Sequence, residues 1–220
     1  MAPSPLAAGL AGHLGDRRLG FLASARVGIA GCGGLGSNAA MLLARSGVGA
    51  FTLVDFDRVE ASNLNRQFFW PGDVGRSKPE ALADRLRGIN PALAIDVSEA
   101  RLDSANARDL FGCPEVPVPG GPPRCRAVIE ALDSARGKAM LCDALGDRVG
   151  LLVCASGVAG WGGPPMRVRP LGPGVRVVGD LATETAPGVP PMAPRVMMAA
   201  ALQADAVLAF LLESADDHPA

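Results

Sequence analysis

The segment "RVGIAGCGGLGSNAAMLLARSG", residues 26–47, decides the fold. A short apolar run over 26–30 is typical of a buried strand, and the glycine-rich "GCGGLG" over 31–36 leads into a helical pattern that ends at Gly47. In this G-x-G-x-x-G arrangement the glycines permit a tight turn, and the free N–H groups of the helix start can face a phosphate. The segment therefore predicts a nucleotide site at the start of an α/β fold.

The alternation of strand and helix continues along the chain. Further buried strands are predicted at 50–55, 92–98, 126–132 and 150–156, with helices at 77–90 and 134–146. Such alternation favours parallel crossovers, so the sequence predicts a doubly wound, mostly parallel Rossmann-like sheet. Two short runs, 166–171 and 175–180, predict an antiparallel extension near the C-terminus.

Length and composition favour one domain. The chain has 220 residues, of which 49% are hydrophobic, enough for a single core. We expect a nucleotide-binding core at about 26–160, followed by an extension and crossover loop at 161–220. The net charge of -1 and the lack of a long basic run predict no nucleic-acid partner. The apolar run 196–213 carries Gln203 and Asp205, which favours a buried or interface helix over a membrane span.

The five cysteines form no CxxC pair, so neither a zinc site nor a disulfide framework is expected. The N-terminus has no charged residue ahead of its apolar patch and no continuous hydrophobic core, which predicts a cytoplasmic setting. The Pro/Gly-rich stretch 112–124 reads as a variable insertion, and we expect it at the amino edge of the sheet, away from the ligand edge.

The second predicted strand ends at Asp55, nineteen residues after Gly36. An acidic side chain at this place can accept hydrogen bonds from ribose hydroxyls. A dinucleotide dehydrogenase would satisfy both features. The next residues, "SNLNRQFF" over 62–69, mix polar groups with aromatic ones in a chain that is only 4% aromatic, so they indicate a more particular role.

The stretch "DFDRVEASNLNRQFF", with "GCGGLGS" before it and "GRSKPEA" after it, closely resembles the ThiF/MoeB family of ubiquitin-activating-enzyme-like adenylyltransferases. The resemblance covers roughly residues 26–160. A second block, "VVGDLATE" and "MAPRV", resembles the short ThiF-type branch that lacks the family's zinc module.

The resemblance implies roles for particular residues. The residues that it places around ATP are Gly31, Gly33, Gly34, Gly36, Asp55, Asn63, Arg66, Gln67 and Lys78. Among them, Asp55 would bind the ribose, Lys78 would contact phosphate, and Arg66 would reach the phosphates of a neighbouring subunit. Asp133, in "EALDS", would hold Mg²⁺. The implied catalytic set is Arg66, Lys78 and Asp133, in a homodimer that uses ATP and Mg²⁺ but no zinc.

The implied reaction is adenylation of the C-terminal glycine of a small ubiquitin-fold sulfur carrier. Such a carrier ends in Gly-Gly, as ThiS-like proteins of thiamine biosynthesis do. Its carboxylate is already ionised, so charge neutralisation is needed and a general base is not. The chain agrees with this logic, since its histidines are His13 and His218 near the termini.

Other functions stay open at this point. One is an adenylating enzyme of a different sulfur-carrier or tRNA-modification pathway, and another is a non-catalytic module that binds nucleotide or carrier. An NAD(P) oxidoreductase is disfavoured because residues 62–67 and Lys78 would have no role in it. The region 179–194 holds no cysteine, which leaves a covalent sulfur-transfer step on that loop in doubt.

Several side chains have simpler interpretations. Asp57 and Glu60 read as solvated loop charges, and Asn63 either caps a turn or contacts ligand. Cys32 reads as a small packing residue. Arg17 and Arg18 stay unassigned, and Cys142 and Cys154 read as buried positions. The aromatic residues Phe68, Phe69 and Trp70 would anchor residues 62–67 against protein.

Overall fold

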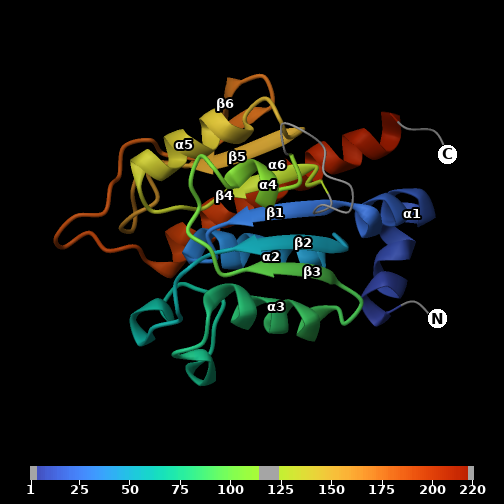
Figure 1. Cartoon of the computed structure of the whole chain (residues 1–220), viewed down its shortest axis with the longest axis horizontal. Coiled ribbons are helices and arrows are strands. Elements are labelled where there is room, and N and C mark those ends of the chain that lie inside the picture. The colour runs from blue at the N-terminus through green and yellow to red at the C-terminus, as the bar shows by residue number, and fades with distance from the viewer. Residues whose placement is uncertain (1–3, 114–123, 218–220) are drawn as a thin grey trace.

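The computed structural model describes residues 4–113 and 124–217, in which helices and strands alternate (Figure 1). The first half contains α1 (Pro5–Ser24), β1 (Arg26–Ala30), α2 (Gly34–Arg45), β2 (Ala50–Val54), α3 (Lys78–Ile89) and β3 (Ala94–Ser98). The second half contains α4 (Ala107–Leu110), β4 (Ala127–Glu130), α5 (Ala135–Leu145), β5 (Leu151–Ala155), β6 (Arg167–Gly172), β7 (Val175–Gly179) and α6 (Ala193–Asp217). Short 3-10 helices, η1 (Ala61–Asn63) and η2 (Pro71–Asp73), lie between β2 and α3.

Within the described residues the strands form one seven-stranded sheet in the order β3-β2-β1-β4-β5-β7-β6. Neighbouring strands are parallel except for the β6–β7 pair, which is antiparallel. The predicted Rossmann-like sheet with an antiparallel extension near the C-terminus is therefore confirmed. From β1 the chain runs outward to β2 and β3 and then crosses to β4 on the other side of β1. The strand order therefore reverses between β1 and β4. In sheets of this kind ligands bind outside the carboxyl ends of the strands at such a reversal.

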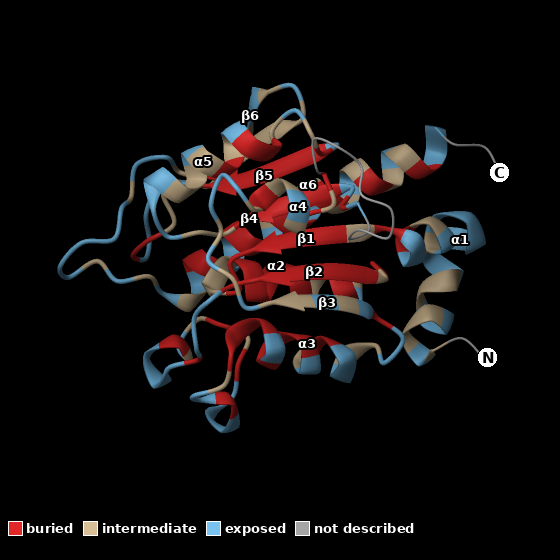
Figure 2. Cartoon of the chain, in the orientation of Figure 1, coloured by how far each residue is buried: buried red, intermediate tan, exposed pale blue. Residues whose placement is uncertain are grey.

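Helices cover both faces of the sheet, and the central strands are buried (Figure 2). Ile29 and Ile129 belong to the core shared with α2, α3 and α6. Val128 and Leu152 point to the opposite face, where they pack with α4 and α5. Successive side chains of β4 thus pack into cores on opposite faces of the sheet, as the alternation of side chains along a strand requires.

Helix α6 is long and apolar enough to cross a membrane by length and composition alone. In the fold it packs on α2 and on the sheet. Its buried Gln203 side chain donates from Nε2 to the backbone oxygens of Glu130 and Val153, each at 3.0 Å. These contacts agree with the interpretation of residues 196–213 as a core helix.

The predicted strands agree with the structure to within two residues, but one helix start was misplaced, and α1, the short α4 and the two 3-10 helices were not predicted. The helix predicted at 37–47 begins earlier, at Gly34, because the glycine loop already supplies its first turn. No element was predicted before residue 26, whereas α1 fills Pro5–Ser24, with Ser4 as its N-cap and a kink at Gly15. The kink interrupts the helical spacing of apolar residues, so the sequence pattern does not indicate a helix there. Residues 114–123 of the expected insertion lie outside the described residues, and its flanks adjoin the amino edge, where Arg126 N donates to Arg26 O.

Two helical glycines predict opposite effects of the same substitution. A Cβ on Gly36 would overlap Gly31 O and lie 2.8 Å from Ile29 Cγ2, whereas a Cβ on Gly88 would meet nothing within 4 Å. We expect Gly36→Ala to lower the free energy of unfolding by more than about 2 kcal/mol. Gly88→Ala should raise it by about 0.5–1 kcal/mol through helix propensity. Urea unfolding measures both values, and equal effects would contradict the close approach at Gly36.

Candidate nucleotide site

The ends of three parallel strands meet at the glycine loop, residues 31–36. Gly31 N, just after β1, donates to Val54 O at the end of β2 (2.9 Å). On its other side a Cβ on Gly31 would lie 2.8 Å from Ala131 O, just after β4, and its φ is +96°. Glycine is therefore required here for both space and backbone conformation. The loop brings the start of α2, with its free N–H groups, to the reversal point of the sheet.

Asp55 lies at this edge as expected, with its carboxylate turned to the loop. Oδ2 accepts from Cys32 N (2.6 Å) and Oδ1 accepts from Asp57 N (2.8 Å). Burial raises the pKa of the Asp55 carboxyl, although these N–H groups and the Lys78 charge oppose the rise. A carboxylate has about four acceptor positions, so hydroxyl donors can still bind. Cys32 is buried, as expected for a packing residue, and burial raises the pKa of its thiol well above the usual range.

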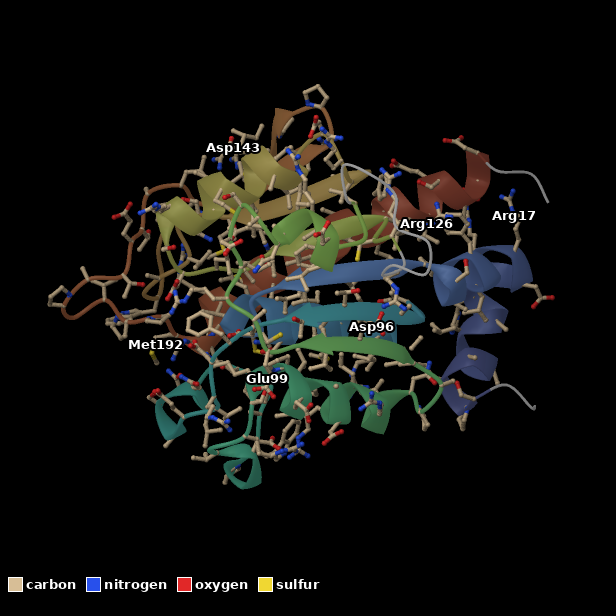
Figure 3. All side chains as sticks on the ribbon, viewed as in Figure 1. Arg17, Asp96, Glu99, Arg126, Asp143 and Met192 are labelled. Atoms are coloured by element: carbon tan, nitrogen blue, oxygen red, sulfur yellow. The ribbon has the colours of Figure 1, made fainter. Side chains whose placement is uncertain are left out.

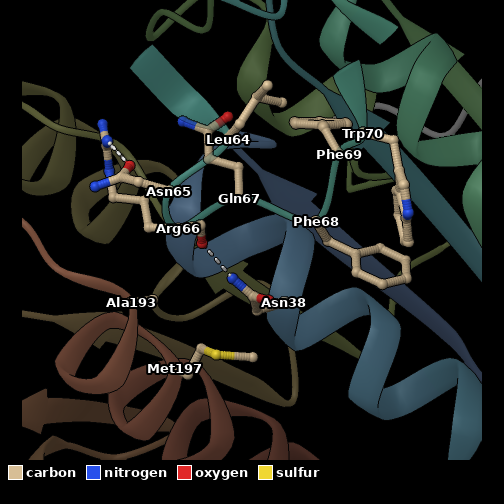
Figure 4. A pocket seen from close by; sticks show the side chains of 10 residues that line it. All are labelled: Asn38, Leu64, Asn65, Arg66, Gln67, Phe68, Phe69, Trp70, Ala193 and Met197. Atoms are coloured by element: carbon tan, nitrogen blue, oxygen red, sulfur yellow. Dashed lines mark hydrogen bonds between the residues drawn. The ribbon is translucent and has the colours of Figure 1, made fainter. Parts of the chain in front are cut away.

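Residues 62–70, here called the polar–aromatic segment, are bonded to the start of α2. Phe68 N donates to Ser37 Oγ (3.0 Å), and Asn38 Nδ2 donates to Arg66 O (2.8 Å). Figure 4 shows the second of these bonds. Ser37 and Asn38 directly follow the glycine loop, so the same turn that shapes the loop also fixes the segment. Neither residue was recognised from the sequence, although "GCGGLGSN" contains both.

Within this segment, Gln67 and Asn63 differ in what they offer a ligand. Gln67 is 9% exposed, and its Nε2 lies beside Gly33, while its Oε1 has no hydrogen-bond partner among the described residues. A buried, unpaired amide oxygen next to the glycine loop is suited to a polar ligand. Asn63 Oδ1 accepts from Glu60 N (3.1 Å) and closes the η1 turn. Of the two interpretations of Asn63, the structure shows the turn.

The Arg66 guanidinium bonds to its own loop. Nη1 donates to Ser62 O (3.1 Å) and to Asn65 Oδ1 (2.8 Å), and the side-chain stem passes Gly34. Partial burial lowers the pKa of Arg66 from its usual value. The structure therefore brings Arg66 to the glycine loop by its stem and leaves its charged end at the protein surface.

The aromatic residues of the segment anchor it unequally. Phe69 is buried in the core shared with α2 and α3. Trp70 is 45% exposed and holds an edge-to-face contact with Phe68, with the Arg85 guanidinium 4.5 Å from its ring centre. The expected anchoring is thus provided by Phe69 and by the partly buried Phe68, which packs against the same core, and least by Trp70.

Lys78, the first residue of α3, is buried beside Asp57. Its Nζ lies 2.8 Å from Asp57 Oδ2, with side-chain exposures of 9% for Lys78 and 47% for Asp57. Backbone bonds from Lys78 N to Asp57 O and from Val59 N to Arg76 O hold the two segments side by side. Asp57 is exposed on its loop, as expected, and it is also the ion-pair partner of Lys78, which the sequence did not indicate.

Asp133 is exposed at the same edge, two residues beyond the contact between Gly31 and Ala131. Glu130 fixes the loop that carries Asp133, because its Oε1 accepts a hydrogen bond from Leu132 N (2.7 Å). Glu130 is fully buried and pairs with Lys138 at 3.0 Å. Burial raises the pKa of the Glu130 carboxyl, against the opposing effect of Lys138 and the Leu132 N–H. The sequence analysis did not predict this pair, although Glu130 is the first residue of the quoted "EALDS".

A buried ion pair joins the two stretches that resemble the short ThiF-type branch, "VVGDLATE" and "MAPRV". Arg195 Nη2 lies 2.6 Å from Asp180 Oδ2, and the two side chains are 3% and 0% exposed. Asp180 also accepts from the N–H groups of Ala182 and Thr183, both at 2.8 Å. Burial alone would raise the pKa of Asp180, but these hydrogen bonds and the Arg195 charge hold it below the usual range. The pair thus fixes the start of the loop after β7 to the start of α6.

Arg17 and Arg18, which the sequence left unassigned, both bind Asp216 near the end of α6. Arg17 lies beyond the amino edge of the sheet, on the opposite side of the protein from Met192 (Figure 3). The two arginines therefore join α1 to α6 and lie far from the glycine loop of their own chain. Of the other unassigned groups, Cys154 is buried as expected, whereas Cys142 is only partly buried.

A hollow of about 270 Å³ lies between the polar–aromatic segment and the start of α6 (Figure 4). It is lined by Asn38, Leu64, Asn65, Arg66, Gln67, Phe68, Phe69, Trp70, Ala193 and Met197. It does not include Asp55, Lys78 or Asp133, so it is a neighbour of the predicted nucleotide site and not the site itself.

The fold and the glycine loop at its reversal point define a Rossmann-like α/β protein. Residues 8–220 match the model of the ThiF family, and the chain belongs to that family. It is 46% identical over 91 residues to a probable adenylyltransferase/sulfurtransferase, MoeZ, of Mycobacterium tuberculosis, covering 41% of this chain and 23% of MoeZ. It is 39% identical over 134 residues to the tRNA threonylcarbamoyladenosine dehydratase of Escherichia coli, covering 60% of this chain and 46% of that enzyme.

The chain therefore spans less than half the length of these curated relatives. Among solved structures it is similar to the E. coli tRNA N6-threonylcarbamoyladenosine dehydratase TcdA in complex with ATP. The TM-score is 0.82 and the identity 26%, over 96% of both chains.

Two Arg–Asp pairs of equal length predict different contributions to stability. Arg195–Asp180 and Arg17–Asp216 are both 2.6 Å long, but the second pair is 48% and 38% exposed. Breaking a buried pair leaves an uncompensated charge, so Arg195→Leu should lower the free energy of unfolding by about 3–5 kcal/mol. Arg17→Leu should cost at most about 1 kcal/mol. Thermal and urea unfolding test this, and similar losses in both variants would contradict it.

Proposed function

We propose that this protein is an ATP-dependent adenylyltransferase that activates a carboxylate. The observation that carries the proposal is the convergence, at one sheet edge, of the glycine loop, the Asp55 carboxylate and the buried Lys78 ammonium. Membership of the ThiF family and the similarity to a structure that holds ATP support it.

The distribution of charge along this edge suits a nucleotide triphosphate. Asp55 would accept the ribose hydroxyls, and the N–H groups at the start of α2 would face the phosphates. Lys78 would donate to a phosphate oxygen, shared with Asp57 or in exchange for it. Gln67 lies beside Gly33 through its Nε2, and its unpaired Oε1 can accept from a donor group of a ligand bound near the glycine loop.

Asp133 fits a role in binding Mg²⁺ together with ATP. Within the described residues there is no cluster of three or more metal-ligating side chains, so a metal caged by protein alone is not supported. Mg²⁺ is commonly held by one or two carboxylates plus substrate phosphates, and the exposed Asp133 at the carboxyl edge supplies such a carboxylate. Bound there, the cation would neutralise phosphate charge.

In the proposed reaction an ionised carboxylate attacks the α-phosphate of ATP, giving an acyl adenylate and pyrophosphate. The chain needs no proton acceptor for this step, because the nucleophile is already an anion. Its task is to hold the triphosphate and offset repulsion between two anions, which the fixed charge of Lys78 and the N–H groups of α2 would do.

Arg66 and the homodimer belong to the same proposal. The Arg66 guanidinium lies at the surface, on a hollow whose lining includes Phe68, Trp70 and Met197. Trp70 and Met197 are each nearly half exposed. An arginine surrounded by exposed apolar groups is suited to a protein interface, where it would reach the phosphates bound by a second copy of the chain.

The first candidate for the carboxylate is the C-terminal glycine of a small ubiquitin-fold sulfur carrier that ends in Gly-Gly, such as a ThiS-like protein of thiamine biosynthesis, acting in the cytoplasm. The second is threonylcarbamoyladenosine in tRNA, whose threonyl group also carries a carboxylate. The similarity to TcdA over 96% of both chains favours the second candidate. The similarity to MoeZ favours the first.

ATP–pyrophosphate exchange tests the activity. With a substrate that supports exchange, Lys78→Ala should lower its rate by about 10²–10³, since an electrostatic stabiliser is lost. Asp133→Ala should lower it similarly, and so should chelation of Mg²⁺. Arg87→Ala, which removes an exposed arginine of α3, is the matched control and should exchange normally. Exchange at the control's rate in Lys78→Ala and Asp133→Ala would contradict the assignment.

The same assay separates the two substrates. Exchange is measured with a carrier ending in Gly-Gly, with the same carrier lacking that dipeptide, and with tRNA that contains threonylcarbamoyladenosine. Exchange with neither authentic substrate, while ATP still binds, would support a non-catalytic binding module. Binding of NAD in preference to ATP would support an oxidoreductase.

Mixing two inactive variants tests whether Arg66 acts between subunits. Arg66→Ala and Asp133→Ala are mixed under conditions that allow chains to exchange. If Arg66 serves the partner's site, mixed dimers contain one intact site and part of the exchange activity returns. If Arg66 serves its own chain, each site lacks one of the two residues and activity stays absent.

A further inference from the structure

We propose that Phe56 and Arg101 form a stacking platform that binds the base of the nucleotide and favours a purine. The inference rests on the proposed function, in that Asp55 holds the ribose. It extends that function by assigning base recognition to two residues that the sequence analysis did not select.

Backbone hydrogen bonding places these two residues side by side. β2 and β3 are parallel neighbours with Val54 opposite Ser98, and Asp55 N donates to Ser98 O (3.2 Å). The chain therefore leaves both strands together at the carboxyl edge. Phe56 directly follows Asp55, and Arg101 lies three residues beyond Ser98.

The Arg101 guanidinium covers the Phe56 ring, with 3.8 Å between its central carbon and the ring centre. Phe56 is nonetheless 48% exposed, and Arg101 is exposed as well. Within the described residues Arg101 forms no ion pair, so its planar cation is not held by a carboxylate. An exposed aromatic ring and a planar cation at a ligand edge both present flat surfaces on which a base can stack.

The position of Asp55 determines what would stack there. In a nucleotide the base is bonded to the ribose carbon next to the one that carries the 2′-hydroxyl. If the hydroxyls bind Asp55, the base must lie close to the same strand end. The phosphates extend towards the glycine loop on the β1 side, so the base extends towards β3, where Phe56 and Arg101 lie.

Neighbouring contacts keep the platform in place. Ala100 and Leu102, on either side of Arg101, pack against the core that contains Phe111 and Val128. Asn106 Nδ2 donates to Arg101 O (2.9 Å). The backbone at 100–102 is thus fixed, and the Arg101 side chain is free to move from the Phe56 ring to a base or to hold a base against it.

Stacking on an aromatic or guanidinium plane recognises ring area and not a particular base edge. It should therefore favour adenine or guanine over cytosine or uracil, since the purine offers the larger π-surface. The platform would contribute binding of the base while leaving the triphosphate contacts to Lys78 and α2.

Equilibrium binding to the full chain tests the platform, with ATP, CTP and inorganic tripolyphosphate as ligands. Phe56→Ala and Arg101→Ala should each weaken ATP binding by about tenfold, the size expected for loss of one stacking contact. Both should reduce the preference for ATP over CTP and leave tripolyphosphate binding unchanged. Arg101→Lys should restore little of the preference, because an ammonium keeps the charge but not the plane.

Controls separate this inference from the proposed function. Arg87→Ala removes an exposed arginine elsewhere, so it should keep the parent's affinities. Thermal unfolding should confirm that the Phe56 and Arg101 variants are folded. If the parent binds ATP and both variants keep its ATP affinity and its preference over CTP, the platform is refuted while the proposed function stands. If the parent binds no ATP, both fail.

Discussion

The close approach of Gly36 to Gly31 is the constraint on which the rest of the structure depends. Because Gly36 has no side chain, α2 can begin directly over the turn that ends β1. Gly31 is then held between the ends of β2 and β4. The start of α2 carries Ser37 and Asn38, and these residues bind the polar–aromatic segment. One steric condition therefore places a helix start, three strand ends and a loop from elsewhere in the chain at the same edge.

Two buried ion pairs support this edge from further away. Glu130 and Lys138 shape the loop that presents Asp133, while Asp180 and Arg195 join the end of β7 to the start of α6. Each carboxylate also accepts backbone N–H groups, so neither pair is a bare contact between charges. Such pairs are weak sources of net stability but strict about geometry. Their value here lies in fixing loops that carry no regular structure of their own.

The sequence predicted most of the fold because its strands are apolar runs bounded by turn residues, and the glycine loop identified β1 before it and α2 after it. Gly31 and Asp133 each follow a predicted strand directly and Asp55 ends another, so the edge that they share follows from the sequence, since parallel strands present their ends together. Helix α1 was missed because Gly15 interrupts its period. The Lys78–Asp57 pair, the role of Ser37 and Asn38 and the ion pair Glu130–Lys138 were missed because each joins residues whose proximity arises only from tertiary packing.

The Lys78–Asp57 pair keeps a positively charged side chain in place at this edge of the sheet. A lysine that is 9% exposed would lose much of its hydration without compensation if it stood alone. Asp57, whose side chain is 47% exposed, is the counter-anion of Lys78 and would be readily hydrated if another anion displaced it. In the proposed function, a phosphate bound at Lys78 would replace one anion by another and would add no uncompensated charge in a poorly hydrated place. The carboxylate set free would turn to solvent, while the backbone bond from Lys78 N to Asp57 O would keep the loop in place.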